Sequence, residues 1–117
     1  MNISYMTKKV ITEFSDRNQF QEFVDQYKGA FIVKFTADWC GPCKKIKDHV
    51  YNLYNNTKST TIMADLDIDK NQDVYSYLKI KSIPTFICYT RGIKCDVLVG
   101  SGEDDVTAFF EACEKYN

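Results

Sequence analysis

The sequence predicts an α/β fold, a central mixed β-sheet of about five strands flanked by about four helices. Segments with strand patterns alternate with segments of helical spacing along most of the chain. The run from Phe31 to Phe35 is apolar apart from Lys34, which is typical of a strand buried on both faces. Near the end, two strand-like runs flank Arg91-Gly92, which predicts a hairpin and therefore an antiparallel part of the sheet.

The first half of the chain is expected to hold two strands and two helices. A short strand covers residues 10–12, and Ser15 is the predicted N-cap of a helix that ends at Gly29. The buried strand covers residues 30–36. Apolar residues at helical spacing predict the two helices, Phe20, Phe23, Val24 and Tyr27 in the first and Ile46, Val50, Leu53 and Tyr54 in the second.

The second half is expected to continue with a strand at residues 60–66, a turn at 69–71 and a short helix. Strands at residues 84–89 and 93–99 form the hairpin. Ser101 and Asp104 have the spacing of a capping box and predict the start of a last helix. The apolar residues of these two helices are Val74, Tyr77 and Leu78 in the short one and Val106, Phe109, Phe110 and Cys113 in the last.

Length and charge favour a single domain over residues 1–117, expected to be a monomer. A net charge of −1 gives no electrostatic case for binding nucleic acid or an anionic membrane. Residues 1–9 lack the apolar stretch of a secretory signal, and no run approaches the ~18 apolar residues of a membrane span. Five cysteines, an odd number, argue against a fully paired secreted framework, so we expect a cytosolic location.

The pair Cys40 and Cys43 directly follows the buried strand and begins the next helix. At a helix N-terminus, unsatisfied N–H groups and the helix dipole favour the thiolate form of Cys40, the expected nucleophile. Cys43 lies about one turn further in and is the expected resolving thiol. Gly41 permits a tight turn, and Pro42 costs no hydrogen bond in the first turn. This spacing predicts dithiol–disulfide exchange.

The cysteines could instead hold a structural zinc ion or act in a Cys–His catalytic pair. A structural zinc site needs about four ligands, and the sequence offers no second Cys-x-x-Cys and no histidine pair, so no metal is expected. His49 is the single histidine. It follows Cys40 by nine helical residues, about 13 Å along the axis, which is too far for proton transfer. We therefore expect His49 to be a surface residue.

The sequence resembles the thioredoxin family from about residue 8 to residue 115. The resemblance is carried by Trp39-Cys40-Gly41-Pro42-Cys43, by Ile83-Pro84-Thr85, and by Gly92 and Gly100. It implies a thioredoxin fold and a protein-disulfide reductase that acts on disulfide-containing client proteins. It also implies recharging by an NADPH-dependent thioredoxin reductase, with no cofactor bound by this chain itself.

The resemblance further implies a substrate-binding surface around the two sulfurs. Its members are Trp39, Gly41, Pro42, Ile83, Pro84 and Gly100. The bond between Ile83 and Pro84 is expected to be cis, and the backbone before the proline is expected to pair with an extended client segment.

The chain departs from the family pattern at two charged positions. The family usually has a buried aspartate where this chain has Lys34, and many members have a lysine where it has Asp65. We interpret this as an exchange of two paired charges, with Asp65 or an associated water accepting the proton of Cys43. The alternative is that Lys34 extends to solvent and takes no part in catalysis.

The other three cysteines are expected to be free thiols. A two-residue hairpin loop would place Cys88 opposite Cys95, where a disulfide could form, whereas a one-residue bulge would remove that register. Cys113 is expected to be a buried, inert thiol.

Two alternatives to a general reductase remain at this point. One is a thioredoxin-like protein specialised for a single client. The other is a binding or scaffold subunit whose thiols are incidental, although a scaffold has no need of both Cys40 and Cys43.

Overall fold

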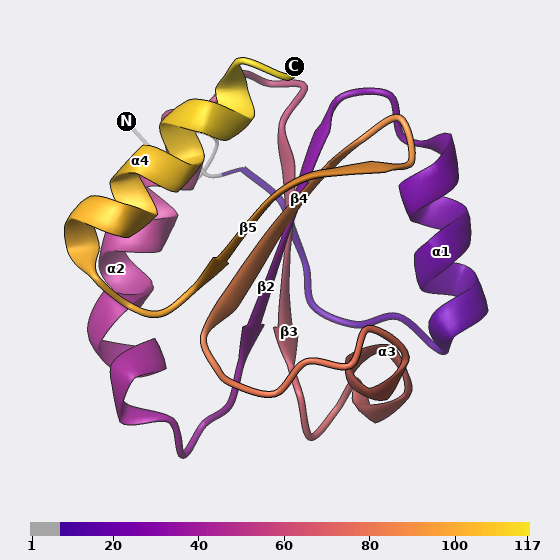
Figure 1. Cartoon of the computed structure of the whole chain (residues 1–117), viewed down its shortest axis with the longest axis horizontal. Helices are drawn as coiled ribbons and strands as arrows, with labels where there is room; N and C mark the ends of the chain where they lie inside the picture. The colour runs from indigo at the N-terminus through magenta and orange to yellow at the C-terminus, as the bar shows by residue number, and fades with distance from the viewer. Residues whose placement is uncertain (1–7) are drawn as a thin grey trace, which may run out of the picture.

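The computed structural model describes residues 8–117, and its sheet has five strands in the order β1-β3-β2-β4-β5 (Figure 1). β2 (Ala30–Thr36) lies in the centre, parallel to β3 (Ile62–Asp67) and antiparallel to β4 (Thr85–Thr90). β1 (Val10–Ile11) extends the parallel side, and β5 (Ile93–Val99) extends the antiparallel side. The predicted mixed sheet is therefore confirmed. The N-terminal segment that lacks a secretory pattern lies largely outside the described residues.

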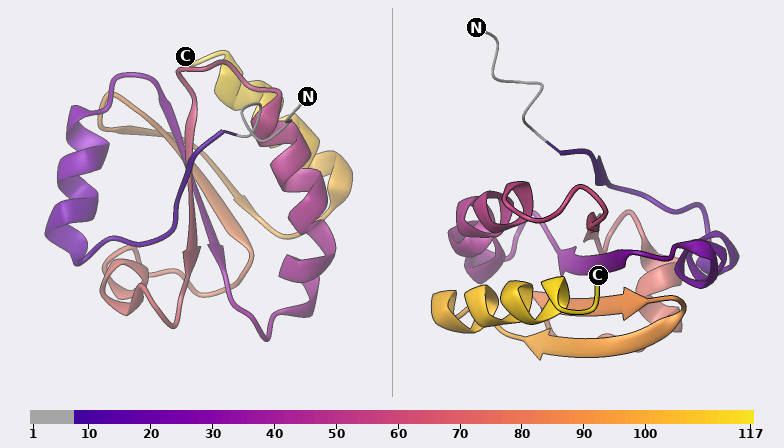
Figure 2. Two further views of the ribbon diagram at one scale, coloured as in Figure 1. Left: turned by 180° about the vertical axis from the view of Figure 1, so that it is seen from behind. Right: turned by 90° about the horizontal axis from the view of Figure 1, so that it is seen from above.

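In the described part of the chain, four helices cover the two faces of the sheet. α2 (Gly41–Asn55) and α4 (Glu103–Glu114) lie together on one side, and α1 (Arg17–Gln26) lies on the other side with α3 (Gln72–Tyr77) (Figure 2). Among the described residues, no helix is long and apolar enough to cross a membrane.

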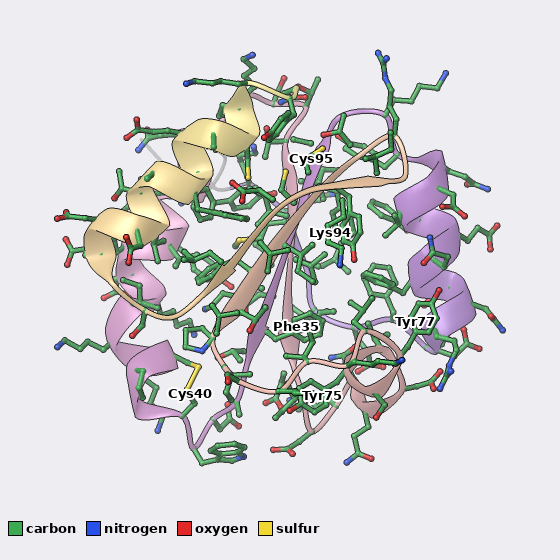
Figure 3. The ribbon with its side chains drawn as sticks, viewed as in Figure 1. Phe35, Cys40, Tyr75, Tyr77, Lys94 and Cys95 are labelled. Carbon is green, nitrogen blue, oxygen red and sulfur yellow. A yellow bond between two sulfur atoms is a disulfide. The ribbon has the colours of Figure 1, made fainter. Side chains whose placement is uncertain are left out.

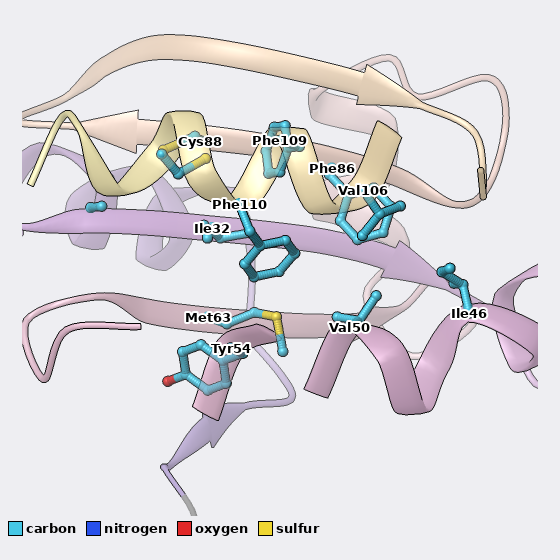
Figure 4. Close-up of a cluster of buried hydrophobic side chains, with 12 residues drawn as sticks. Ile32, Ile46, Val50, Tyr54, Met63, Phe86, Cys88, Val106, Phe109 and Phe110 are labelled. Carbon is cyan, nitrogen blue, oxygen red and sulfur yellow. The ribbon is translucent and has the colours of Figure 1, made fainter. Parts of the chain in front are cut away.

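Each face of the sheet has its own apolar core, because successive side chains of a strand point to opposite faces. On β2, Ile32 packs toward α2 and α4, whereas Phe31 and Val33 pack toward α1. The same alternation puts Lys34 on the side of Ile32. Figure 4 shows the first core between the sheet and the two helices, with Val50, Phe86, Val106, Phe109 and Phe110 at its centre.

The start of α1 differs from the prediction by one residue. Asp16, not Ser15, is the N-cap, and its carboxylate accepts the backbone N–H of Gln19 at 2.9 Å. Ser15 instead donates its own N–H to the Gln19 side chain at 2.6 Å. An ionised cap also interacts favourably with the positive end of the helix dipole, which explains the preference.

We expect Asp16→Ala to lower the free energy of unfolding by about 1 kcal/mol, because the Gln19 N–H loses its acceptor. The matched change Ser15→Ala should cost clearly less, since the backbone N–H of Ser15 remains. Urea denaturation of the two variants measures the difference. Equal costs would contradict the assignment of the cap.

The predicted capping box before the last helix is wrong. α4 begins after Gly102, which is its N-cap and makes no side-chain cap bond. Three acidic residues occupy the first turn, Glu103, Asp104 and Asp105. Their charges favour the helix start through the dipole and take the place of a capping side chain. The short helix also differs in detail, because Tyr77 is exposed.

The hairpin contains a bulge that separates Cys88 from Cys95. The turn residues Arg91 and Gly92 both have positive φ, so Thr90 pairs with Ile93 as expected. The register then shifts, and Cys88 faces Asp96. Cys88, Cys95 and Cys113 are all free thiols.

Cys88 and Cys113 are fully buried in the first core. The hydrogen bond with Cys88, and after it burial, raises the pKa of the Cys113 thiol. A thiol that stays protonated is a poor nucleophile, in agreement with the predicted inert role of Cys113.

Candidate active site

The redox pair lies where β2 leads into α2. Cys40 is the N-cap of α2 and forms a disulfide with Cys43 in the first turn (Figure 3). The backbone N–H of Cys43 points at Cys40 Sγ, 3.2 Å away. Pro42 occupies the first turn, where its missing N–H removes no helical bond. The sulfur of Cys40 is therefore placed at the positive end of the helix, which stabilises a thiolate.

The two cysteines differ in access to solvent. Cys40 is 5% exposed and Cys43 is 1% exposed, so Cys43 is the more shielded thiol, as predicted. The pair packs against Ala37, Ile68 and Ile83. Cys40 is less exposed than its place at a helix start suggests, because these apolar side chains surround the disulfide.

The loop that leads into β4 faces the disulfide. The Ile83–Pro84 bond is cis, as the resemblance implies, and the Ile83 carbonyl oxygen lies 4.0 Å from Cys40 Sγ. The Thr85 hydroxyl donates to the Ser82 carbonyl at 2.6 Å, which ties the loop to itself. The Gly100 N–H donates to the Pro84 carbonyl at 3.0 Å, which joins the end of β5 to the same loop.

Glycine is required at residue 100 because of the backbone conformation there and not because a side chain would lack space. Gly100 has a φ of 132°, and a Cβ built there would meet nothing within 4 Å. Gly41 is equally open. Trp39 stands at the edge of the site, 66% exposed, and its indole N–H donates to Asp69 at 3.0 Å. The indole is thus a large apolar surface held in place beside the sulfurs.

Lys34 and Asp65 are neighbours on β2 and β3, as expected from the exchange of charges. Their Cα atoms are register partners, and Lys34 Nζ lies 3.6 Å from Asp65 Oδ1. The side chain of Lys34 is 1% exposed and that of Asp65 is 10% exposed. The alternative that Lys34 extends to solvent is therefore wrong. Burial lowers the pKa of Lys34, and the charge of Asp65 opposes that lowering.

A cavity of about 170 Å³ connects this ion pair with the resolving thiol. Lys34, Asp65 and Cys43 all line it, and a space of this size holds water. The remaining residues of its wall are Thr36, Ala37, Asp38, Lys44 and Lys47. Cys43 and Asp65 therefore share one cavity that is large enough for water.

His49 is not a simple surface residue. Its side chain is 27% exposed, and Nε2 lies 2.7 Å from the Thr107 hydroxyl, so it links α2 to α4. Within residues 8–117, no group of three or more His, Cys, Asp or Glu side chains is arranged to hold a metal ion.

Comparison with known proteins decides the family. The sequence model described as Thioredoxin matches residues 10–112. The chain belongs to the thioredoxin family. Human thioredoxin is 32% identical over 100 residues, which cover 85% of this chain and 94% of the human protein. Thioredoxin H7 of Arabidopsis thaliana is 30% identical over 104 residues, covering 86% and 80% of the two chains.

Solved thioredoxin structures have the same fold. The thioredoxin of Malassezia sympodialis superposes with a TM-score of 0.78 at 25% identity, over 92% of each chain. That of Schistosoma mansoni gives 0.76 at 27% identity, over 92% of this chain and 96% of the other. Membership of the thioredoxin family, together with the Cys40–Cys43 disulfide, makes this chain a thiol–disulfide oxidoreductase and a protein-disulfide reductase.

Three residues at the site were not singled out from the sequence. Ile68 packs on the disulfide, Asp69 holds Trp39, and the Tyr51 hydroxyl donates to Asp65 Oδ2 at 2.6 Å. A signal for Tyr51 was present, because residues 43, 47 and 51 are spaced at i, i+4 and i+8 and so share one face of α2. Ile68 and Asp69 follow β3, and nothing in their local pattern connects them with the cysteines.

Proposed function

We propose that this thioredoxin-family reductase uses Cys40 as nucleophile and Cys43 as resolving thiol, and that a thioredoxin reductase recharges it with electrons from NADPH. The observation that carries the proposal is the place of Cys40 as N-cap of α2, in a disulfide with the more deeply buried Cys43. A cytosolic location and a monomeric state remain predictions.

The proposed reaction has two exchange steps. The Cys40 thiolate attacks one sulfur of a client disulfide, forming a Cys40–client disulfide and releasing the other client sulfur as a thiolate. Cys43, once deprotonated, attacks Cys40 Sγ, so that the Cys40–Cys43 disulfide forms and the second client thiolate leaves. The client is reduced by two electrons and the dithiol is oxidised by two.

We assign the proton of Cys43 to Asp65. The shared cavity and the burial of the Lys34–Asp65 pair support this assignment. Lys34 Nζ lies 3.6 Å from Asp65 Oδ1, so the proposed proton acceptor has its ion-pair partner beside it. In the family, an aspartate on the strand before the motif usually accepts the proton of the resolving thiol. Here the proposed acceptor, Asp65, lies on the neighbouring strand β3, and the lysine lies on β2.

The client is proposed to bind over Trp39, Gly41, Pro42, Ile83, Pro84 and Gly100. The free space above Gly41 and Gly100 and the exposed indole support such a surface. An extended client segment can pair with the backbone at Ile83, whose carbonyl lies beside Cys40.

The test is the reduction of insulin by the purified protein in the presence of a thioredoxin reductase and NADPH. The rate of NADPH consumption is the quantity measured. We expect consumption that depends on both the chain and insulin. If the protein reduces insulin with dithiothreitol as the electron donor but not with thioredoxin reductase and NADPH, the proposed electron donor is contradicted. Failure with both reductants would favour the scaffold alternative.

A further inference from the structure

We propose that Tyr51 is a positioning residue that holds the Asp65 carboxylate in the orientation needed to accept the proton of Cys43. The inference rests on the role proposed above for Asp65. It assigns to α2 a second contribution to the reaction, in addition to the thiols at its start.

The two oxygens of Asp65 have different surroundings. Oδ2 accepts the Tyr51 hydroxyl at 2.6 Å. Oδ1 is buried, lies 3.6 Å from Lys34 Nζ, and has no hydrogen-bond partner among residues 8–117. The hydroxyl of Tyr51 therefore occupies one oxygen and leaves the other free to accept a proton.

The hydroxyl of Tyr51 is suited to act as a permanent donor. Burial, and after it the hydrogen bond and the charge of Asp65, raises the pKa of Tyr51, so the phenol keeps its proton. Two cations also lie near the ring, with Lys34 Nζ and Lys47 Nζ each 5.9 Å from its centroid. Attraction between these charges and the ring favours one fixed position of the side chain.

Without this donor, only the ion pair with Lys34 would hold the Asp65 carboxylate. A carboxylate beside a buried ammonium is free to rotate and bring both oxygens toward the charge. The short bond to Tyr51 opposes that rotation and keeps Asp65 at the wall shared with Cys43. The exchanged pair of charges thus depends on a residue of α2 to function as a base.

The test compares Tyr51→Phe with Tyr54→Phe, because both changes remove one hydroxyl from α2. The Tyr54 hydroxyl donates to the Lys9 carbonyl and makes no contact with Asp65. Single-turnover reduction of a disulfide client, stopped with acid, gives the rate at which the mixed disulfide disappears. We expect Tyr51→Phe to slow this step about tenfold near neutral pH, the scale of a lost hydrogen bond to a charged group.

A double-mutant cycle separates positioning from simple support of the fold. Tyr51→Phe should slow the resolving step only where Asp65 is present, whereas Tyr54→Phe should keep the wild-type rate and differ only in stability. The pair Tyr51→Phe and Asp65→Asn should be no slower together than Asp65→Asn alone.

The possible failures can be told apart. A wild-type resolving rate in Tyr51→Phe, with a slow Asp65→Asn, would overturn the role of Tyr51 and leave that of Asp65 intact. A normal resolving rate in Asp65→Asn would overturn the role of Asp65, and with it this inference. Equal slowing by both tyrosine variants, with the slowing by Tyr51→Phe simply added to that of Asp65→Asn, would show that Tyr51 only supports the helix.

Discussion

The Cys43→Ser variant should accumulate a covalent disulfide between Cys40 and its client instead of completing turnover. The first exchange step needs only the Cys40 sulfur at the start of α2, and this sulfur is unchanged in the variant. The second step needs a thiol in the first turn, and a serine hydroxyl cannot attack the mixed disulfide. We expect turnover to fall below detection, and the adduct to appear on non-reducing gels and by mass spectrometry.

Two matched variants make this result specific. Cys40→Ser should lose turnover without forming an adduct, because no nucleophile faces the client. Cys95→Ser should reduce clients at the wild-type rate, since Cys95 is a free thiol of β5 near the hairpin, at the opposite end of β4 from the cis-proline loop (Figure 3). An adduct formed by Cys40→Ser through Cys43 would reverse the two assigned roles.

The fold was predictable because its strongest signals are local. A strand buried on both faces must be apolar, and residues 30–35 of β2 are apolar except at Lys34. Helices that cover a sheet must repeat apolar residues every three to four positions, as α2 and α4 do. Ends of elements are set by single hydrogen bonds, so the choice between Ser15 and Asp16 could not be made from their residue types alone.

The bulge in the hairpin shows a second limit of the sequence. The turn at Arg91-Gly92 fixes the first two pairs of the ladder, but the register then shifts between Cys88 and Tyr89. Turn residues alone do not determine whether a bulge follows, so the local pattern left both registers open for Cys88.

The candidate site was predictable where its residues are adjacent in sequence or fixed by family resemblance. Cys40 and Cys43 needed only their spacing, and the proximity of Lys34 and Asp65 followed from the exchange of their charges. Tyr51 was missed because its importance arises from a contact between α2 and β3, 14 residues apart. Burial of Lys34 also required the structure, since a lysine stem is long enough to reach solvent from many strands.

Asp65→Asn should lower the free energy of unfolding by about 3 kcal/mol, because it leaves the ammonium of Lys34 buried without its counter-charge. The loss should depend on pH. The pKa of Lys34 is already lowered from 10.5 in the folded chain, so between that lowered value and 10.5 the unfolded chain binds more protons and stability rises with pH. Removing Asp65 removes the charge that opposes the lowering of the Lys34 pKa. The pH range in which stability rises with pH therefore extends further toward neutral pH.

Urea denaturation of the wild type and Asp65→Asn at neutral pH and at about pH 10 measures this dependence. We expect the difference between the two proteins to shrink at the higher pH, where Lys34 in the variant loses its proton and no longer needs a partner. A difference that does not change with pH would show that the cost comes from packing and not from the unpaired charge.

The exchanged variant, Lys34→Asp with Asp65→Lys, extends the same argument to function. If the two charges act as a pair, each single change should be costly, and the double change should recover much of the stability and of the insulin-reducing activity. The recovered aspartate would stand on β2 and line the same cavity as Cys43, so proton transfer would need no new path. Recovery of stability without recovery of activity would show that the base must stand on β3. This outcome would fit the role of Tyr51, because its hydroxyl bonds to residue 65 of the pair. Strictly additive losses would contradict the pairing itself. When two buried charges 3.6 Å apart stabilise each other, the loss of stability in the double variant differs from the sum of the two single losses.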